Sequence, residues 1–395
     1  MSAKMNLPKD VNYIISKLLS AGYEAFVVGG AVRDFLLGDA PGDYDITTSA
    51  VPGEVKAVFN SEKTVDTGIK HGTVSVILKH KAYEVTTYRI DGEYLDARHP
   101  ESVSFTRNIN EDLARRDFTV NAMAYNETRG LVDLFGGQED LERGVIRAVG
   151  LAEKRFEEDA LRILRALRFA SRLDFKIEES TSKAIFEKAE LLEKVARERI
   201  YTEWIKLLSG KGAYRIINEY RDVISLFIPE LSKISLPEEE SFKKADFDLR
   251  FISLFKDLSA AKWLTALDGL RADNKMKLLG KALLENLEKE LTTEYEMKLM
   301  LSKIGEEYTE KLIKLKALCQ RAQGSEEAIF KKVIESGEAY RLSDMKLSGK
   351  DLSEMGIFGR ETGEILAKAL DSVMRGEVKN ERNALLAFVK LLKNE

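Results

Sequence analysis

Two aspartates separated by a single residue are the first candidates for chemistry in this chain. Asp43 and Asp45 stand in the segment GDYDI, within a stretch, DYDITT, that we predict to form a β-strand. Alternate side chains of a strand point to the same face, so the two carboxylates would converge. Like charges at close range repel each other unless a cation lies between them, and Mg²⁺ prefers carboxylate and phosphate oxygens. Such a pair alone is typical of surface charge, so its meaning depends on its neighbours.

A pair of glycines lies upstream of these aspartates, in the segment VVGGAVRD. Gly29 and Gly30 fall between an apolar strand, EAFVVGG, and a helix, AVRDFLLG. Paired glycines at this place let backbone N–H groups approach a phosphate at the start of the helix. Arg33 would add a charge-assisted hydrogen bond to a phosphate oxygen. A tight turn would need the same glycines, but together with the carboxylates they favour a nucleotide triphosphate site.

A third carboxylate, Glu84, lies on the second arm of a predicted hairpin. The arms are GTVSVILKH and AYEVTTYRI, with a turn near Lys81, and both alternate in polarity as half-buried strands do. Alternation puts Glu84, Thr86 and Tyr88 on one face. If this arm lies beside the strand of Asp43, three carboxylates could hold two metal ions that activate a hydroxyl and stabilise leaving pyrophosphate. A solvent-exposed strand glutamate is the alternative.

Four charged residues share one face of a helix that we predict over 155–173. Asp159, Arg162, Arg165 and Arg168 follow one another at intervals that place them on neighbouring rows. The opposite face is apolar and would pack inward; it holds Ala160, Ile163, Leu164 and Leu167. A face of ion pairs, such as Glu158 with Arg162, is the structural alternative.

The pairing of Asp159 with Arg162 could distinguish nucleobases. A carboxylate only accepts hydrogen bonds and a guanidinium only donates them. Cytosine and adenine each present an amine beside a ring-nitrogen acceptor, whereas uracil and guanine present the reverse pattern. The pair would therefore accept C and A and reject U and G, because the wrong bases leave buried polar groups unpaired.

Composition limits the kind of protein that carries these residues. The chain has 395 residues, of which 44% are apolar and 32% charged, with a formal charge of −4; this describes a globular protein of about two to three domains. One cysteine, Cys319, excludes an internal disulfide and suggests a reducing compartment. No long apolar run occurs, so we expect a cytoplasmic protein without a membrane segment. No histidine precedes an aspartate, which excludes a hydrolytic domain of the HD type.

The predicted elements divide the chain into a mixed part and a helical part. Residues 1–150 combine a helix near 10–21 with the strands and hairpin above. From residue 151 onward helical periodicity dominates, and proline is absent after residue 237. We predict helices over 155–173, 180–194, 200–208, 359–375 and 381–393. The fold class is therefore α+β, with a mixed sheet at the amino-terminal end.

Five segments of the chain occur in a recognisable order: VGGAVRD, GDYDI, YEVTTYR, LARRDFTVNAMAYN and EEDALRILRALRF. In this order they resemble class II tRNA nucleotidyltransferases, the family of the bacterial CCA-adding enzymes and poly(A) polymerases. The resemblance is dense over 20–172, includes DLFGGQEDL, and continues weakly in SGKDL and GRETGEIL. Gly42 departs from the family, which often has a basic or amide residue there.

The resemblance implies a division into four parts. Residues 1–150 would be a catalytic nucleotidyltransferase head of the polymerase-beta-like fold. A helical neck at 151–210 would select the nucleobase, followed by a helical body at 211–290 and a helical, tRNA-binding tail at 291–395. The lysines and arginines of the neck and tail would make tRNA binding sensitive to salt.

The resemblance also implies a reaction, the Mg²⁺-dependent, template-independent addition of CCA to the 3′ end of tRNA from CTP and ATP. The catalytic and metal-binding carboxylates would be Asp43, Asp45 and Glu84. The nucleotide-binding residues would be Gly29, Gly30, Arg33, Arg116, Asn121, Asp159, Arg162, Arg165 and Arg168. The partner would be the acceptor stem and 3′ end of tRNA, bound by a monomer or homodimer.

Residues 88–107 bear on which nucleotides are added. This connection is long and contains Arg89, Asp91, Arg98 and His99; long irregular loops are often functional. It corresponds to the family's flexible loop for the terminal A, which argues against an enzyme that adds only CC. An A-adding enzyme, a poly(A) polymerase and a non-catalytic tRNA-binding protein stay open, although three retained carboxylates speak against the last.

Overall fold

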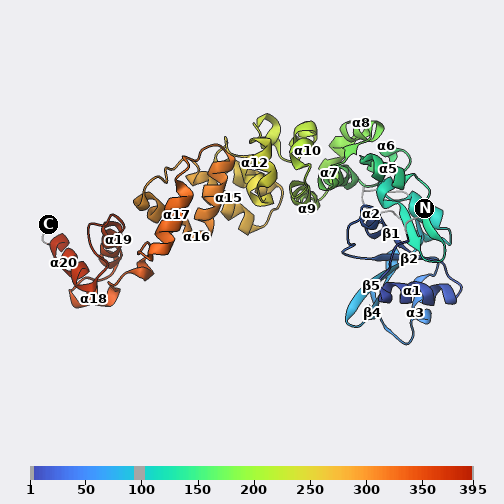
Figure 1. The fold of residues 1–395 in the computed structure, drawn as a ribbon, viewed down its shortest axis with the longest axis horizontal. Coiled ribbons are helices and arrows are strands. Elements are labelled where there is room, and N and C mark those ends of the chain that lie inside the picture. Colours follow the sequence, from blue (N-terminus) through green and yellow to red (C-terminus); the bar gives the residue numbers. More distant parts are fainter. Residues whose placement is uncertain (1–3, 93–102, 394–395) are drawn as a thin grey trace. The chain divides into compact units, whose positions relative to one another are not determined.

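The computed structural model describes residues 4–92 and 103–393 and divides into two compact units (Figure 1). The first unit comprises Met1–Ser232 with Gly269–Arg271, and the second comprises Lys233–Asp268 with Ala272–Glu395. Within the described residues, no helix combines the length and apolar character that crossing a membrane requires.

A seven-stranded mixed sheet forms the amino-terminal part of the first unit, in the order β3-β4-β5-β2-β1-β8-β9. Its strands are β1 (Ala25–Val28), β2 (Asp45–Thr48), β3 (Lys63–Gly68), β4 (Thr73–Leu78), β5 (Lys81–Thr87), β8 (Met123–Asn126) and β9 (Gly130–Asp133). Only the β2–β5 pair within this sheet is parallel. Two small pairs complete the described strands: β6 (Arg89–Asp91) with β7 (Val103–Phe105), and β10 (Val145–Ile146) with β11 (Lys176–Ile177).

The central strand β1 is a continuous apolar run, AFVV, and every one of its side chains is buried. A core cluster forms around it from Phe26, Val28, Tyr88, Ile109, Leu113, Ala124 and Val132. Helix α1 (Lys9–Ser20) packs against β1, and α3 (Pro52–Val58) packs against β4 and β5 (Figure 1). Other short helices of this part are α2 (Gly30–Leu36), η1 (Ile69–His71), α4 (Ile109–Ala114), η2 (Thr119–Asn121) and α5 (Gly137–Arg143).

The predicted hairpin is confirmed as β4 and β5, with its turn next to Lys81. Leu78 pairs with Lys81, so Lys79 and His80 are the turn residues and Lys81 already belongs to the strand. Both turn residues have positive φ, 47° and 66°. A two-residue hairpin turn of this handedness matches the twist of the strands, although neither residue is the glycine or asparagine that usually signals it.

The single helix predicted over 155–173 is wrong, because the chain breaks it into α6 (Ala152–Glu158) and α7 (Leu161–Leu173). Asp159 has an extended conformation at the break, with φ −140° and ψ 103°. Its side chain accepts a hydrogen bond from the Leu161 N–H at 3.1 Å. An aspartate that caps a new helix in this way competes with continuation of the preceding one. The inward packing of the predicted apolar face is confirmed, since Ala160, Ile163, Leu164 and Leu167 are all buried.

The remaining chain is helical, which confirms the α+β class. The rest of the first unit contains α8 (Glu179–Lys188), η3 (Ala189–Lys194), α9 (Arg197–Leu208), α10 (Ala213–Glu219) and α11 (Arg221–Ser225). Two elements, η4 (Pro229–Lys233) and α14 (Ala260–Gly269), cross the limits of the units. The second unit contains α12 (Glu239–Lys244), α13 (Phe247–Ser253), α15 (Asn274–Asn286), α16 (Glu294–Leu318), α17 (Glu326–Ser336), η5 (Leu342–Asp344), α18 (Gly349–Glu354), α19 (Arg360–Met374) and α20 (Arg382–Lys393). The last two helices agree with the predicted ones.

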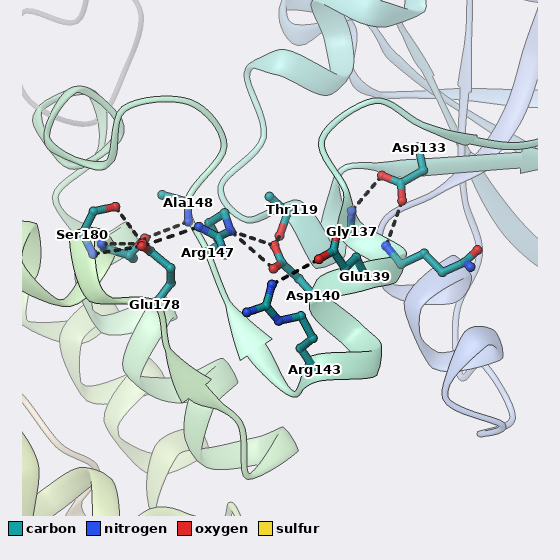
Figure 2. A network of polar contacts seen from close by, with 12 residues as sticks. Thr119, Asp133, Gly137, Glu139, Asp140, Arg143, Arg147, Ala148, Glu178 and Ser180 are labelled. Carbon is teal, nitrogen blue, oxygen red and sulfur yellow. Dashed lines mark hydrogen bonds and ion pairs between the residues drawn. The ribbon is translucent and has the colours of Figure 1, made fainter.

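A polar network joins the end of the sheet region to the first helices beyond it (Figure 2). Arg147 contacts Asp140 at 3.2 Å and Glu178 at 3.5 Å. Asp140 also accepts a hydrogen bond from the Thr119 hydroxyl at 2.7 Å. Glu178 caps α8 by accepting from the backbone N–H groups of Ser180 and Thr181. The network therefore fixes η2, which begins at Thr119, to the amino-terminal end of α8.

Replacement of this cap should destabilise the first unit. Burial alone would raise the pKa of Glu178, but hydrogen bonds from Ser180 and Thr181 lower it to about 2 from its usual 4.5. We expect Glu178→Ala to lower the free energy of unfolding by about 1 kcal/mol at neutral pH, as loss of a cap does. Because the pKa of Glu178 is lowered on folding, its carboxylate stabilises the folded state fully above pH 4.5. The difference in unfolding free energy between the wild-type protein and the variant should shrink as the pH falls towards 2.

Urea denaturation at neutral pH and near pH 3 measures this effect. Glu179→Ala is the matched control, because Glu179 is exposed in the same first turn but is not the residue whose side chain caps the helix. Equal stability of the two variants would show that the cap does not stabilise the unit.

Candidate active site

The predicted carboxylates lie on or just before two neighbouring strands: Asp45 begins β2, and Glu84 lies in the middle of β5. Asp45 is the first residue of β2, and Asp43 precedes it by two residues in an irregular segment. Strand β2 runs parallel to β5 in a register that pairs Ile46 with Val85. Asp45 comes directly before Ile46, and Glu84 directly before Val85. The two acids therefore lie next to each other on adjacent strands, and their side chains point to the same face of the sheet. The predicted proximity of the two strands is confirmed.

Asp43 and Asp45 interact electrostatically. Partial burial raises the pKa of Asp45, the carboxylate of Asp43 raises it further, and the Arg116 guanidinium opposes both effects. A divalent cation would relieve the repulsion, and carboxylate oxygens are the donors that Mg²⁺ takes. Among the described residues, no three acidic, histidine or cysteine side chains gather closely enough to hold a metal ion by themselves, so the structure does not bring Asp43, Asp45 and Glu84 together as the predicted three-carboxylate cluster. The pair therefore fits a cation that takes its other ligands from a substrate or from water.

The glycine pair forms the turn from β1 into α2. Gly29 has φ 70°, which L side chains rarely adopt, and its N–H donates to the Met123 carbonyl at 3.1 Å. A Cβ atom at Gly29 would lie 3.2 Å from Nη1 of Arg116. Glycine therefore lets the Arg116 side chain approach the turn, and Gly30 begins the helix.

Arg33 is almost fully buried, with 3% of its surface exposed, and is held from two sides. It donates to Asp34 at 2.6 and 2.9 Å and to the Asn121 side chain at 2.7 Å. Its guanidinium also lies 5.2 Å from the centre of the Phe169 ring. The structure therefore brings together two of the predicted nucleotide-binding residues, Arg33 and Asn121.

Asp112 holds Arg116 and is a residue that the sequence patterns did not indicate. Its side chain is fully buried and contacts Arg115 at 2.8 Å and Arg116 at 3.3 Å. Burial alone would raise the pKa of Asp112, but the guanidinium groups of Arg116 and Arg115 lower it. The available signal was the spacing, since an acid three and four residues before arginines faces them on a helix.

Asp117 connects the sheet region to helix α7. Its carboxylate accepts from the Phe118 N–H at 2.8 Å and from the Asn121 amide at 3.3 Å. The other oxygen accepts two hydrogen bonds from Arg165, at 2.8 and 2.5 Å. Burial opposes ionisation, but the Arg165 guanidinium lowers the pKa of Asp117 to about 2. Arg33, Asn121, Asp117 and Arg165 thus form one continuous network.

The charged face predicted along 159–168 is organised differently from the prediction. Asp159 does not face Arg162 on a common helix; its carboxylate pairs with Arg199 at 3.3 Å. Arg162 instead pairs with Glu158 at 2.7 Å and donates to the Arg115 carbonyl at 3.0 Å. The ion pair weighed as the alternative is therefore present. The correction follows from the break at Asp159, which ends the helical spacing on which the prediction depended.

Arg168 lies farther along α7, 2.8 Å from Glu203 of α9. Its guanidinium lies 4.0 Å from the Phe169 ring centre, and that of Arg165 lies 5.5 Å from it. Phe169 is therefore a buried packing residue, with three guanidinium groups around its ring. Of the connection 88–107, Arg89 begins β6, whereas Arg98 and His99 lie outside the described residues.

Comparison with protein families identifies the class. Residues 25–147 match the family described as the Poly A polymerase head domain. Residues 174–234 match the family described as the probable RNA- and SrmB-binding site of polymerase A. A mixed-sheet head with paired carboxylates beside a glycine turn, followed by helices, therefore defines a nucleotidyltransferase.

Relatives over the full length give the family. The CCA-adding enzyme of Ligilactobacillus salivarius is 37% identical over 97% of this chain and 96% of its own length. That of Enterococcus faecalis is 37% identical over 97% and 95%. The Bacillus stearothermophilus CCA-adding enzyme, solved in complex with CTP, has a TM-score of 0.80 at 34% identity and covers 99% of this chain and 98% of its own. The chain belongs to the family of CCA-adding enzymes.

The network through Asp117 should be a main source of stability in the first unit. We expect Asp117→Asn to lower the free energy of unfolding by about 3 kcal/mol, because Arg165 loses its anion in a partly buried place. Since the pKa of Asp117 is about 2 against its usual 3.8, this loss should be complete above pH 3.8 and shrink as the pH falls towards 2.

Chemical denaturation of the wild-type protein and of the Asp117→Asn variant, across this pH range, measures the predicted loss of stability. Glu139→Gln is the control, because Glu139 forms an exposed ion pair with Arg143 that contributes less than about 0.5 kcal/mol. A loss at Asp117 no greater than the loss at Glu139 would contradict the assignment.

Proposed function

We propose that this protein adds C, C and A to the 3′ end of tRNA, using CTP and ATP without a nucleic-acid template. The observation that carries the proposal is the coupled Asp43–Asp45 pair beside Arg116 and the glycine turn, in a chain whose relatives match over nearly its whole length. The solved relatives include one in complex with CTP, and one from Thermotoga maritima complexed with tRNA at 25% identity and a TM-score of 0.70.

The reaction joins the substrates in line. The 3′-hydroxyl oxygen of the tRNA attacks the α-phosphorus of the nucleotide, the bond to the β-phosphate oxygen breaks, and pyrophosphate leaves. Two Mg²⁺ ions held by Asp43, Asp45 and Glu84 together with substrate phosphates would supply positive charge for the attacking and leaving oxygens. Asp43 and Asp45 must be ionised for this role, and a bound cation would oppose the raised pKa of Asp45.

The residues around the glycine turn would bind the triphosphate. Arg33 uses three of its five N–H groups on Asp34 and Asn121, which leaves two donors for a phosphate oxygen. Arg116 lies beside Gly29 and interacts with Asp45, so its charge falls between the glycine turn and the carboxylates. Asn121, fixed by Arg33 and Asp117, would lie close to the ribose.

Asp159 and Arg162 would read the base once the base replaces contacts that these side chains make in the free protein. The Asp159 carboxylate is partly exposed and held by Arg199 at 3.3 Å, a contact that a base amine can replace. Arg162 is held by Glu158 and by the Arg115 carbonyl, so its direction is fixed from both sides. Arg165 and Arg168 would add base or phosphate contacts. We retain the proposed head (1–150), neck (151–210), body (211–290) and tail (291–395).

The length of the product decides between the possible activities. Purified protein with Mg²⁺ receives three tRNA transcripts, which lack CCA, end in C or end in CC, each with CTP, ATP or both. Growth of the shortest transcript by CCA, followed by a stop, supports the proposal. One A added only to the CC end would indicate an A-adding enzyme, a long A ladder a poly(A) polymerase, and binding without extension a tRNA-binding protein.

Removal of one carboxylate should abolish addition without unfolding the protein. We expect Asp43→Asn to reduce the rate at least about 100-fold, because charge on the attacking and leaving oxygens is no longer compensated. The rate of incorporation of the first C measures this, and thermal denaturation checks the fold. Asp39→Asn is the control, since Asp39 is exposed in the same connection and makes the same change of charge. Full activity of the Asp43 variant would overturn the metal assignment.

Base selection should depend on Asp159. We expect Asp159→Ala to reduce the preference for CTP over UTP about 10- to 100-fold while changing the KM for CTP less, because the pattern of acceptors is lost. Loss of the cap on α7 should also cost about 1 kcal/mol of stability. Arg199→Ala is the control, because it removes the partner of Asp159 but keeps the carboxylate. An unchanged preference for CTP over UTP in the Asp159→Ala variant would contradict the proposed role of Asp159 in base selection.

A further inference from the structure

A fully buried acid on α4, Asp112, holds an arginine of the proposed nucleotide site. Its side chain has no exposed surface, and its helix neighbours Ile109 and Leu113 belong to the core cluster around β1. Close packing of the core therefore fixes α4 and gives the carboxylate little freedom to move. A buried charge has to be paired, so the groups that Asp112 holds indicate what it does.

The two oxygens of Asp112 have different partners. Oδ1 accepts hydrogen bonds from Nε and Nη2 of Arg115, at 3.0 and 2.8 Å, and from the Arg89 backbone N–H at 3.4 Å. Oδ2 accepts from Nη2 of Arg116 at 3.3 Å and from the Thr47 hydroxyl at 3.5 Å. One oxygen thus fixes the acid to Arg115 and to the start of β6, and the other reaches the nucleotide site.

Thr47 relates this second oxygen to the proposed metal-binding carboxylates. Thr47 lies two residues beyond Asp45 on β2, so the two side chains point to the same face of the strand. Their Cα atoms are about 7 Å apart along an extended strand. The Asp112 carboxylate contacts Thr47 and therefore lies on the face from which Asp45 projects.

Arg116 has a single anionic anchor. Among the residues that the structure describes, it forms an ion pair with Asp112 only, and its buried Nε has no hydrogen-bond partner. Its Nη1 lies at the glycine turn, 3.2 Å from the place of a Cβ atom on Gly29. The guanidinium is therefore held through one nitrogen and keeps donors for a ligand.

A second acid competes for this arginine. Burial and the Asp43 carboxylate raise the pKa of Asp45, and the Arg116 guanidinium opposes them, so the two side chains already attract each other. Without the charge on Asp112, the aspartate pair would be the carboxylates left to attract Arg116, and a guanidinium readily pairs with a carboxylate. Arg116 would then take oxygen atoms that a divalent cation needs as ligands.

We propose that Asp112 is a positioning residue for the nucleotidyl transfer. It holds Arg116 at the glycine turn and away from Asp45. The guanidinium thereby stays available to the phosphates of the nucleotide, and Asp45 stays available to Mg²⁺. The inference rests on the proposed function, since it concerns binding of the same nucleotide. Asp112 itself is buried and has both oxygens occupied, so it acts through Arg116 and touches neither substrate nor metal.

The isosteric variant Asp112→Asn tests this role. Its carbonyl can keep the shorter hydrogen bonds from Arg115, while its amide group replaces the oxygen that faces Arg116. Binding of CTP is measured by equilibrium dialysis without tRNA, so that no transfer occurs, over a range of Mg²⁺ concentrations. We expect the Kd for CTP to rise about tenfold, as loss of a hydrogen bond to a charged group does. The Mg²⁺ concentration for half-maximal binding should rise as well, because the released guanidinium competes with the cation for Asp45.

A second substitution distinguishes positioning from a general effect on the fold. Arg116→Gln removes the group through which Asp112 is proposed to act. Adding Asp112→Asn to that variant should therefore change neither the Kd for CTP nor the Mg²⁺ requirement further. The matched control is Asp248→Asn, because Asp248 is a buried acid that pairs with Lys311 in the second unit and makes the same change of charge. Urea denaturation checks that each variant is folded.

Asp112→Glu replaces the asparagine variant if that variant does not fold. It keeps the charge but moves the carboxylate by one methylene group, and a displacement of about 1 Å weakens the contacts that a positioning group directs. CTP affinity should fall below that of the wild-type protein, and should not fall further when Arg116→Gln is already present.

Two results would overturn the inference. The first is a Kd for CTP and a Mg²⁺ requirement of the Asp112 variant equal to those of Asp248→Asn. The second is the same loss of CTP affinity on substitution of Asp112 in the wild-type and Arg116→Gln backgrounds, which would show that Asp112 acts on the fold. Failure of the wild-type protein to bind CTP would instead contradict the proposed function, so the two failures are distinguishable.

Discussion

Buried guanidinium groups need anionic partners, and this requirement organises the part of the molecule that carries the proposed chemistry. Each arginine of the proposed nucleotide site contacts one carboxylate: Arg33 with Asp34, Arg116 with Asp112, Arg162 with Glu158, Arg165 with Asp117 and Arg168 with Glu203. Three of these arginines belong to α7, and their acids come from α6, from α9 and from the segment before η2. The pairs thus determine which elements surround α7.

The same arrangement connects stability to substrate binding. A guanidinium group held by one carboxylate keeps some of its N–H groups free, so a fixed arginine can still bind a phosphate. Around Phe169 three such groups share one ring, which keeps them close together despite their like charges. Repulsion between them is tolerable in the free protein because of the acids, and is reduced further when a polyanion binds.

Local patterns predicted the features that depend on neighbouring residues. Strand alternation predicted the exposed face on which Glu84 lies, and helical spacing predicted the buried face of α7. The break at Asp159 was missed because aspartate is also compatible with a helix interior, and only the hydrogen bond to Leu161 decides for a cap. The bond between Asp117 and Arg165 joins residues 48 positions apart, and no spacing rule reaches that far. The fold class was therefore more accessible from sequence than the arrangement of the charges.

The Asp117–Arg165 pair has a consequence for how this sequence can change over time. Replacing either residue alone leaves its partner charged and without its counter-ion, so each single substitution should cost stability that a change at both positions avoids. The two positions are thereby coupled in evolution, because the effect of a change at one depends on the residue at the other. Joint randomisation of both codons should therefore yield more stable alternatives than variation of either codon alone.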